Sequence, residues 1–290
     1  MSRVLVIGGC GYVGGAIFSQ LSGIGHSVHT VDLELSGNVI NPINIKRDYR
    51  TLSRKFLSGY EVVVVAAAHS SVSQCSGDPY GAFQNNVVNF VNLLAKLKNQ
   101  KLIYASSSCV YSGSNLNIDH IENSTLPTPC DHLTLTKSVI DQYAQKSSVE
   151  CYGLRFGSVN GYTPNFRRDL MINAMSLSAM TNGVVRVSNK HQYRPILFIR
   201  SLAAAVERIV DSKEDRRGIY NVANFNMQIG AIAGAVGAHF GVQIEEVRGP
   251  SGYDFRIDSG RFRRAFGLPE VTIKDIVSQI DWNKEEICGP

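Results

Sequence analysis

The chain contains 290 residues, of which 44% are hydrophobic and 18% are charged, and its formal net charge at pH 7 is +5. These values are typical of an ordinary globular protein with a sizeable core, in one large domain or two joined ones. Lysine and arginine are scattered along the sequence, so we expect no nucleic-acid partner. The longest apolar run, residues 62–68, is too short to cross a membrane, so we expect no membrane partner.

The chain begins with a short apolar strand that runs into a glycine cluster and then into a helix. Residues 3–14 read RVLVIGGCGYVG, and the spacings Gly9-x-Gly11-x-x-Gly14 and Gly8-x-x-Gly11-x-x-Gly14 both fit the turn that binds a dinucleotide. An early glycine allows a tight turn, Gly11 lets the backbone approach a pyrophosphate, and Gly14 lets helix and sheet pack closely. The amides at the start of the helix can then hold the anion.

Asp32 closes the next predicted strand, in the run SVHTVD. A carboxylate at this place in a dinucleotide-binding fold accepts hydrogen bonds from the adenosine ribose. The same carboxylate would repel a 2′-phosphate. The sequence therefore predicts that NAD is preferred over NADP.

Short apolar runs alternate with segments of helical periodicity through the first half of the chain. Strands are predicted at Val4–Ile7, Val28–Val31, Val62–Ala66, Lys101–Ala105 and Cys151–Arg155. Helices are predicted near residues 12–23, 50–57, 79–98 and 132–147. This alternation is typical of an α/β protein whose parallel sheet is covered on both faces.

The alternation fades beyond about residue 160, where a helix near 168–180 and a strand at Ile219–Val222 are predicted. We therefore predict a Rossmann-type doubly wound parallel sheet with a smaller C-terminal substrate-binding region. Residues 1–160 would form the NAD-binding domain, with a returning segment near 195–223. Residues 161–290 would form mainly the substrate-binding region.

The cysteines form neither a CxxC pair nor a Cys/His spacing typical of a metal site, so we predict no metal. No signal peptide is apparent, because the first apolar stretch contains the glycine turn. A reducing, cytoplasmic location is the simplest expectation. The six cysteines are Cys10, Cys75, Cys109, Cys130, Cys151 and Cys288.

Four further segments follow the glycine turn in a characteristic order. They are AAAHSSV at 66–72, KLIYASSSCVYSG at 101–113, LRFGSVNG at 154–161 and QYRPILFIRSLAAA at 192–205. With the glycine turn, this set resembles the extended short-chain dehydrogenase/reductase family, in particular the nucleotide-sugar epimerases and dehydratases typified by UDP-galactose 4-epimerase. The resemblance implies NAD as the cofactor, a nucleotide sugar as the substrate and a homodimer that pairs the helices near 79–98 and 132–147.

The resemblance also implies which residues form the site. Ser107 matches the catalytic serine or threonine that hydrogen-bonds the sugar, and Lys137 matches the lysine that holds the nicotinamide ribose. Arg194 matches the arginine that grips the diphosphate, and Ser158 and Arg256 are further expected substrate contacts. The expected cofactor-binding residues are Gly8, Gly11, Tyr12, Val13, Gly14, Asp32, Asp48, Ala66, Ala67 and Lys137.

The sequence departs from the family pattern at the residue that carries the chemistry. Four positions before Lys137 the family has a tyrosine that acts as general acid and base, and this chain has Leu133. Leucine cannot transfer a proton. His132 and His69 are the candidate catalytic substitutes, although a helical step turns His132 about 100° away from residue 133.

These features favour a NAD-dependent enzyme that acts on a nucleotide-activated sugar, of the epimerase, dehydrogenase or ketosugar reductase type, with an atypical acid/base group. A second hypothesis, favoured by Leu133, is a catalytically weak or inactive homologue that binds dinucleotide and sugar nucleotide in a sensing or regulatory role. A third is a different reaction on the same fold, with the cofactor in a structural role.

Overall fold

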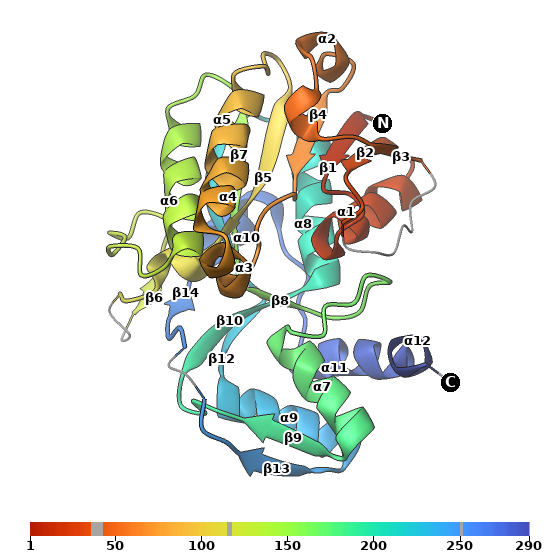
Figure 1. Ribbon diagram of the computed structural model, residues 1–290, viewed down its shortest axis with the longest axis vertical. Helices are drawn as coiled ribbons and strands as arrows, with labels where there is room; N and C mark the ends of the chain where they lie inside the picture. The colour runs from red at the N-terminus through yellow and green to blue at the C-terminus, as the bar shows by residue number, and fades with distance from the viewer. Residues whose placement is uncertain (36–42, 115–117, 250–251, 290) are drawn as a thin grey trace.

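The computed structural model describes residues 1–35, 43–114, 118–249 and 252–289 (Figure 1). Its larger part is built on a seven-stranded sheet with the order β11-β7-β5-β4-β1-β2-β3, and every strand pair in it is parallel. The prediction of a doubly wound parallel sheet is confirmed. The strands are β1 (Arg3–Ile7), β2 (Ser27–Asp32), β3 (Asn44–Lys46), β4 (Val62–Val65), β5 (Lys101–Ser107), β7 (Cys151–Phe156) and β11 (Gly218–Val222).

Both faces of this sheet are buried. On β1, Val4 and Val6 pack into one apolar cluster, whereas Leu5 and Ile7 pack into another on the opposite face. Successive side chains of a strand point to opposite faces, so a strand covered on both sides must be apolar throughout. This explains why the central strands read as continuous runs such as VVVV in β4.

Helices cover each face of the sheet. α1 (Tyr12–Gly23) and α8 (Ile199–Asp211) contribute to the first cluster and are joined by a 2.6 Å hydrogen bond from Gln20 Nε2 to Glu207. α2 (Arg54–Leu57), α5 (Asn89–Leu94) and α6 (His132–Gln145) contribute to the second. α3 (Val72–Gly77), α4 (Pro79–Phe83) and a π-helical turn, η2 (Gln84–Val88), precede α5.

The smaller part lies below the large sheet in Figure 1. It contains a three-stranded sheet in the order β12-β10-β8, and β9 pairs with β13. These strands are β8 (Ser158–Asn160), β9 (Val184–Val187), β10 (Tyr193–Phe198), β12 (Phe225–Gln228) and β13 (Gln243–Glu246). The helices near them are α7 (Met171–Asn182), α9 (Ile229–Phe240), α11 (Ile273–Trp282) and α12 (Lys284–Cys288).

The chain returns from the smaller part to the larger one more than once. Within 195–223, α8 and β11 pack into the larger part, whereas β10 belongs to the three-stranded sheet. A later return was not predicted. β14 (Arg256–Ile257) pairs with β6 (Asp119–His120), and α10 (Gly260–Phe266) packs against β11.

One predicted helix needs correction, and one short helix was not predicted. The helix expected near 50–57 is divided into a 3-10 turn at Tyr49–Thr51, capped by Asp48, and the short α2, capped by Ser53. The helix α3 was not predicted, and the hydroxyl of Ser71 accepts the bond that begins it.

Among the described residues, no helix is long and apolar enough to span a membrane, and no acidic, histidine and cysteine side chains gather as a metal site would require.

Candidate functional site

The turn between β1 and α1 has no room for a side chain at Gly8, Gly9 and Gly14, for reasons within the protein itself. Gly8 has a φ of 86°, and a Cβ there would lie 2.5 Å from the amide nitrogen of Ala67. A Cβ on Gly14 would collide with the carbonyl oxygen of Gly8 and lie 2.9 Å from the Cα of Gly9. Glycine at these positions lets α1 approach the turn closely enough for its amino end to face the sheet edge.

Gly11 differs, because no protein contact requires glycine there. Its φ of −80° and ψ of 176° are open to any residue, and an added Cβ would meet only the Gly8 carbonyl oxygen, at 3.4 Å. Gly11 is the N-cap of α1 and borders a large cleft. A ligand that approaches the backbone closely, such as a pyrophosphate, explains the missing side chain.

The carboxylate of Asp32 is held at the end of β2 by two backbone amides. Its Oδ2 accepts a 3.0 Å bond from Cys10 N, and its Oδ1 accepts a 2.7 Å bond from Glu34 N. A carboxylate has about four lone-pair sites, so capacity remains for ribose hydroxyls. Arg47 borders the same cleft.

A single cleft of about 1020 Å³ brings most of the predicted site residues together. It reaches the carboxyl ends of β1, β2, β4 and β5, where open α/β folds bind their ligands. The segment that follows Gly157 lines it from the side of the smaller part. The predicted residues that line it are Gly8, Gly11, Tyr12, Val13, Gly14, Asp32, Asp48, Ala66, Ala67, His69, Ser107, Lys137, Ser158 and Arg194.

Ser107 and Lys137 meet at the end of β5. The Ser107 hydroxyl accepts a 3.2 Å bond from Cys109 N, and Lys137 Nζ donates a 2.6 Å bond to the Ala105 carbonyl. Lys137 is buried, and this burial lowers the pKa of its ammonium group, with Cys109 and Asp141 opposing the shift. The lysine is thus fixed beside the serine, within the cleft.

Leu133 is an apolar element of the cleft wall. It is only 7% exposed and packs with Cys75, Ala82 and Cys109. Burial raises the pKa of the Cys109 thiol to about 11, so this neighbour stays a neutral thiol. No group of this cluster holds an ionised acid or base.

The two histidines differ in placement. His132 is exposed and does not line the cleft, because the helical step from residue 133 turns it outward; its role as a substitute base stays a prediction. His69 does line the cleft, and its backbone is clamped by Asn86, which accepts from His69 N at 2.8 Å and donates to His69 O at 3.0 Å. Its Nε2 lies 3.9 Å from Asp78.

The predicted substrate contacts also divide. Arg194 lines the cleft, its Nη1 donates to the Tyr193 carbonyl at 3.0 Å, and no carboxylate lies within ion-pair distance among the described residues. Burial lowers the pKa of its guanidinium. Arg256 does not line the cleft, because its guanidinium pairs with Asp119 at 2.8 Å and lies over the Tyr193 ring. A substrate contact by Arg256 therefore stays a prediction, which the lining of this cleft does not support.

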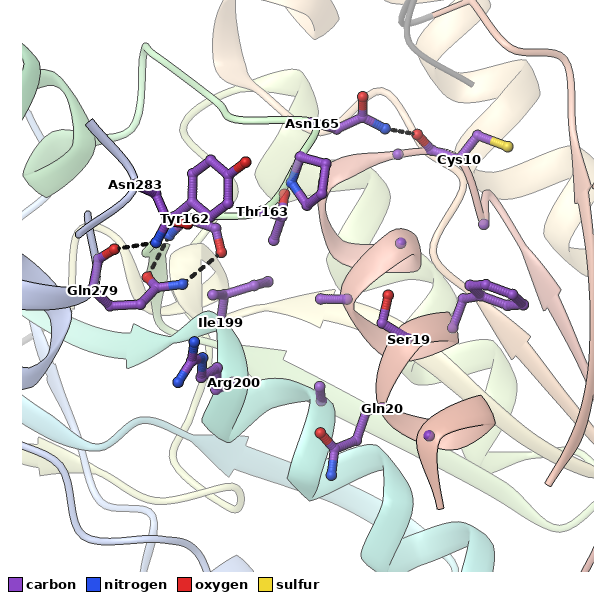
Figure 2. A pocket seen from close by; sticks show the side chains of 18 of the residues that line it. Cys10, Ser19, Gln20, Tyr162, Thr163, Asn165, Ile199, Arg200, Gln279 and Asn283 are labelled. Atoms are coloured by element: carbon purple, nitrogen blue, oxygen red, sulfur yellow. Dashed lines mark hydrogen bonds between the residues drawn. The ribbon is translucent and has the colours of Figure 1, made fainter. Parts of the chain in front are cut away.

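A smaller cavity of about 690 Å³ lies on the other side of α1 (Figure 2). Figure 2 shows Asn165 reaching the carbonyl of Cys10, and Gln279 bridging Tyr162 and Asn283. Of the predicted site residues only Gly11 lines it. The bond from Asn165 braces the glycine turn from behind, and the larger cleft, which most of the predicted site residues line, is the candidate active site.

Sequence reasoning missed Tyr253, which lines the cleft from the chain segment before β14. It stands outside all the segments that carry the family resemblance. No local motif or periodicity distinguishes it, and only the fold brings it to this wall.

With this geometry established, the chain can be compared with known proteins. Residues 4–223 match the sequence model of the NAD dependent epimerase/dehydratase family. The chain belongs to this family. The predicted family and, at the level of the family, NAD as the cofactor are thereby confirmed.

Individual relatives agree. Protein CapI of Staphylococcus aureus is 26% identical over 236 residues, which span 72% of this chain and 69% of that protein. A UDP-glucose 4-epimerase of Corynebacterium glutamicum is 26% identical over 68% of this chain and 62% of its own length.

Two solved structures share the fold. The NAD dependent NDP-hexosamine 5,6-dehydratase TunA has a TM-score of 0.87 and 20% identity, over 98% of each chain. The Thermus thermophilus UDP-glucose 4-epimerase, solved with NAD, has a TM-score of 0.82 and 20% identity, over 96% of this chain and 99% of that one.

Proposed function

We propose that this protein is a NAD-dependent enzyme that acts on a nucleotide-activated sugar, by epimerisation, dehydrogenation or ketosugar reduction. One observation carries the proposal: Asp32, Ser107, Lys137 and Arg194 line a single cleft at the carboxyl edge of the parallel sheet. Asp32 would accept hydrogen bonds from the ribose, and Ser107 would contact a sugar hydroxyl. Lys137 supplies a fixed positive charge, and Arg194 would bind the diphosphate. NAD, when bound, would accept and return a hydride.

The cofactor half of the cleft fits a dinucleotide. The amides that open α1 have no intrahelical acceptors and would hold the pyrophosphate over Gly11. Asp32 would accept from the adenosine ribose, and Asp48, ion-paired with Arg50 at 2.5 Å, would border the adenine. Lys137, already buried against β5, would donate to the nicotinamide ribose.

The substrate half fits an anionic ligand. Arg194 offers a guanidinium that has no carboxylate partner among the residues the structure describes, and a guanidinium fork matches the paired oxygens of a diphosphate. Ser107 and Ser158 line the same cleft as Arg194 and Lys137 and would contact the sugar. The acid/base group is atypical, because Leu133 stands where the family has tyrosine.

A second candidate function is a homologue that binds both ligands but turns over slowly or not at all, in a sensing or regulatory role. The observation that favours it is the apolar cluster around Leu133, which leaves no ionisable group at the family's acid/base position.

One experiment separates the two functions. The purified protein is loaded with NAD and mixed in turn with UDP-, GDP-, CDP- and dTDP-sugars, and the absorbance of NADH is followed. A transient or lasting rise with any of these sugars supports the enzyme. Binding of a sugar nucleotide, seen by calorimetry, without any absorbance change supports the second candidate.

We also propose that the chain forms a homodimer through α4 and α6. Tyr80 and Phe83 on α4, and Leu135 and Tyr143 on α6, leave large apolar side chains exposed, as an unpaired helical interface would. Light scattering at several concentrations would test the dimer.

A reducing, cytoplasmic setting is further supported by the cysteines, all of which are free thiols.

A further inference from the structure

Tyr253 lies beside the leucine that replaces the family's tyrosine. Its ring packs against the cluster of Leu133, Cys109, Cys75 and Ala82. It borders the same cleft as Ser107 and Lys137. A distant part of the chain therefore brings a phenol to the wall where α6 provides none.

The hydroxyl of Tyr253 is hydrogen-bonded to an ionisable partner. It donates to Oδ2 of Asp131, the N-cap of α6, whose Oδ1 accepts a 2.8 Å bond from Thr134 N. Cys130 Sγ also contacts Oδ2, at 3.5 Å. Phenol and carboxylate thus form a pair in which one group holds a proton and the other can accept it.

The surroundings of the pair determine which of the two groups holds the proton. Burial acts to raise the pKa of Asp131, but the bonds from the Thr134 amide and Tyr253 outweigh it, and the pKa lies below its usual range. Burial, and then the bond to Asp131, raise the pKa of the Tyr253 phenol. The resting pair is therefore neutral tyrosine and ionised aspartate.

We infer that Tyr253 is the catalytic acid/base of this site and that Asp131 is the proton acceptor behind it. The inference rests on the proposed function, which it deepens. As the sugar is oxidised, its hydroxyl proton passes to the Tyr253 oxygen while the Tyr253 proton passes to Asp131 Oδ2. The sugar C–H bond breaks, its hydride goes to bound NAD⁺, and the carbon–oxygen bond becomes a carbonyl. The return step reverses each transfer.

Charge balance favours this relay. Oxidation removes one positive charge from the cofactor and, through the relay, one negative charge from Asp131, so the net charge of the closed site does not change. Tyr253 remains a neutral phenol before and after the step.

The test compares wild type, Tyr253→Phe and Asp131→Asn, with Tyr143→Phe as the matched control. Tyr143 lies on α6, is 47% exposed and does not line the cleft. The rate of NADH formation is measured with a sugar nucleotide that reduces NAD bound to wild type. Tyr253→Phe should lower this rate by about 10²–10⁴-fold. Calorimetry should give unchanged Kd values for NAD and sugar nucleotide, and Tyr143→Phe should behave as wild type.

Asp131→Asn tests the second transfer. Asparagine caps a helix about as well as aspartate, so the melting temperature should change little. Its amide cannot take the proton, so kcat should fall at least about tenfold while KM is unchanged. In mixtures of H₂O and D₂O, wild type should give a curved dependence of rate on deuterium fraction, because two protons move together. A merely structural Asp131 would give a linear dependence in wild type, which would overturn the relay.

The outcomes distinguish this inference from the proposed function. If wild type reduces NAD and Tyr253→Phe does so at the same rate, only the inference is overturned. If wild type binds both ligands and never reduces NAD, the proposed function fails and the inference fails with it.

Discussion

The glycine turn offers a sharp test of cofactor binding, because Gly11 and Gly14 are small for different reasons. At Gly11, an alanine Cβ would make one ordinary contact, at 3.4 Å. Alanine restricts the unfolded chain, which stabilises by about 0.4–1 kcal/mol, and it is a poorer N-cap than glycine by a comparable amount. The free energy of unfolding of Gly11→Ala should therefore stay within about 1 kcal/mol of wild type.

Its affinity for NAD should change much more. A methyl group that displaces the pyrophosphate from the α1 amides would weaken a charge-assisted hydrogen bond, which is worth about 1.5–3 kcal/mol. A loss of about 2 kcal/mol corresponds to a Kd roughly 30-fold higher.

Gly14→Ala is the matched control, and it should lower the stability of the protein more than its affinity for NAD. Its Cβ would lie 2.7 Å from the carbonyl carbon of Gly8 and 2.9 Å from the Cα of Gly9, both backbone atoms. Overpacking of this kind costs about 1–3 kcal/mol, so its melting temperature should fall by several degrees.

Thermal unfolding without cofactor, and calorimetric titration with NAD, give the two quantities for each variant. The reasoning is refuted if Gly11→Ala binds NAD as wild type does, or if it unfolds at a lower temperature than Gly14→Ala.

Three further predictions concern the cleft. NAD should bind more tightly than NADP by on the order of 1–4 kcal/mol, because Asp32 would repel the 2′-phosphate. Arg47→Ala should increase this difference in binding free energy. Equal Kd values for NAD and NADP in calorimetry would contradict the predicted preference. Arg194→Ala should weaken the binding of UDP-, GDP-, CDP- or dTDP-sugars by roughly 1.5–3 kcal/mol with NAD affinity unchanged, and a thermal-shift series in which it matches wild type would count against the diphosphate anchor. His132→Ala should leave NADH formation unaltered, since His132 does not line the cleft, and loss of turnover would restore it as a candidate base.

The framework of the fold could be read from the sequence because local signals agreed with each other. A strand buried on both faces is mostly apolar, so β1 and β4 stand out as continuous runs. The glycine turn fixes where the first helix begins. Short polar helices such as α3 escape notice, because a serine cap and two turns leave almost no apolar periodicity.

The site was predictable only where its residues follow strand ends. Asp32 and Ser107 end β2 and β5, and parallel strands bring their carboxyl ends to one edge. The ion pair of Arg256 with Asp119 could not be predicted, because the pairing of β14 with β6 that forms it is a long-range contact without a local signature. The outward direction of His132 could be predicted, because one helical step turns it about 100° away from Leu133.

The fold brings residues that are distant in the sequence to one wall of the cleft, so a leucine at position 133 does not by itself abolish proton transfer. A proton relay requires a donor and an acceptor at one wall of the cleft, whichever chain segments supply them. Leu133 fills the wall with apolar contact and packs against the ring of Tyr253, so the hydroxyl lost from α6 is returned by the C-terminal segment. The carboxylate that receives the bond, Asp131, belongs to α6 itself and begins that helix. Because the helix that carries Lys137 is capped by the group that would accept the proton, the buried cation and the proton acceptor belong to one helix, and only Tyr253 comes from another segment.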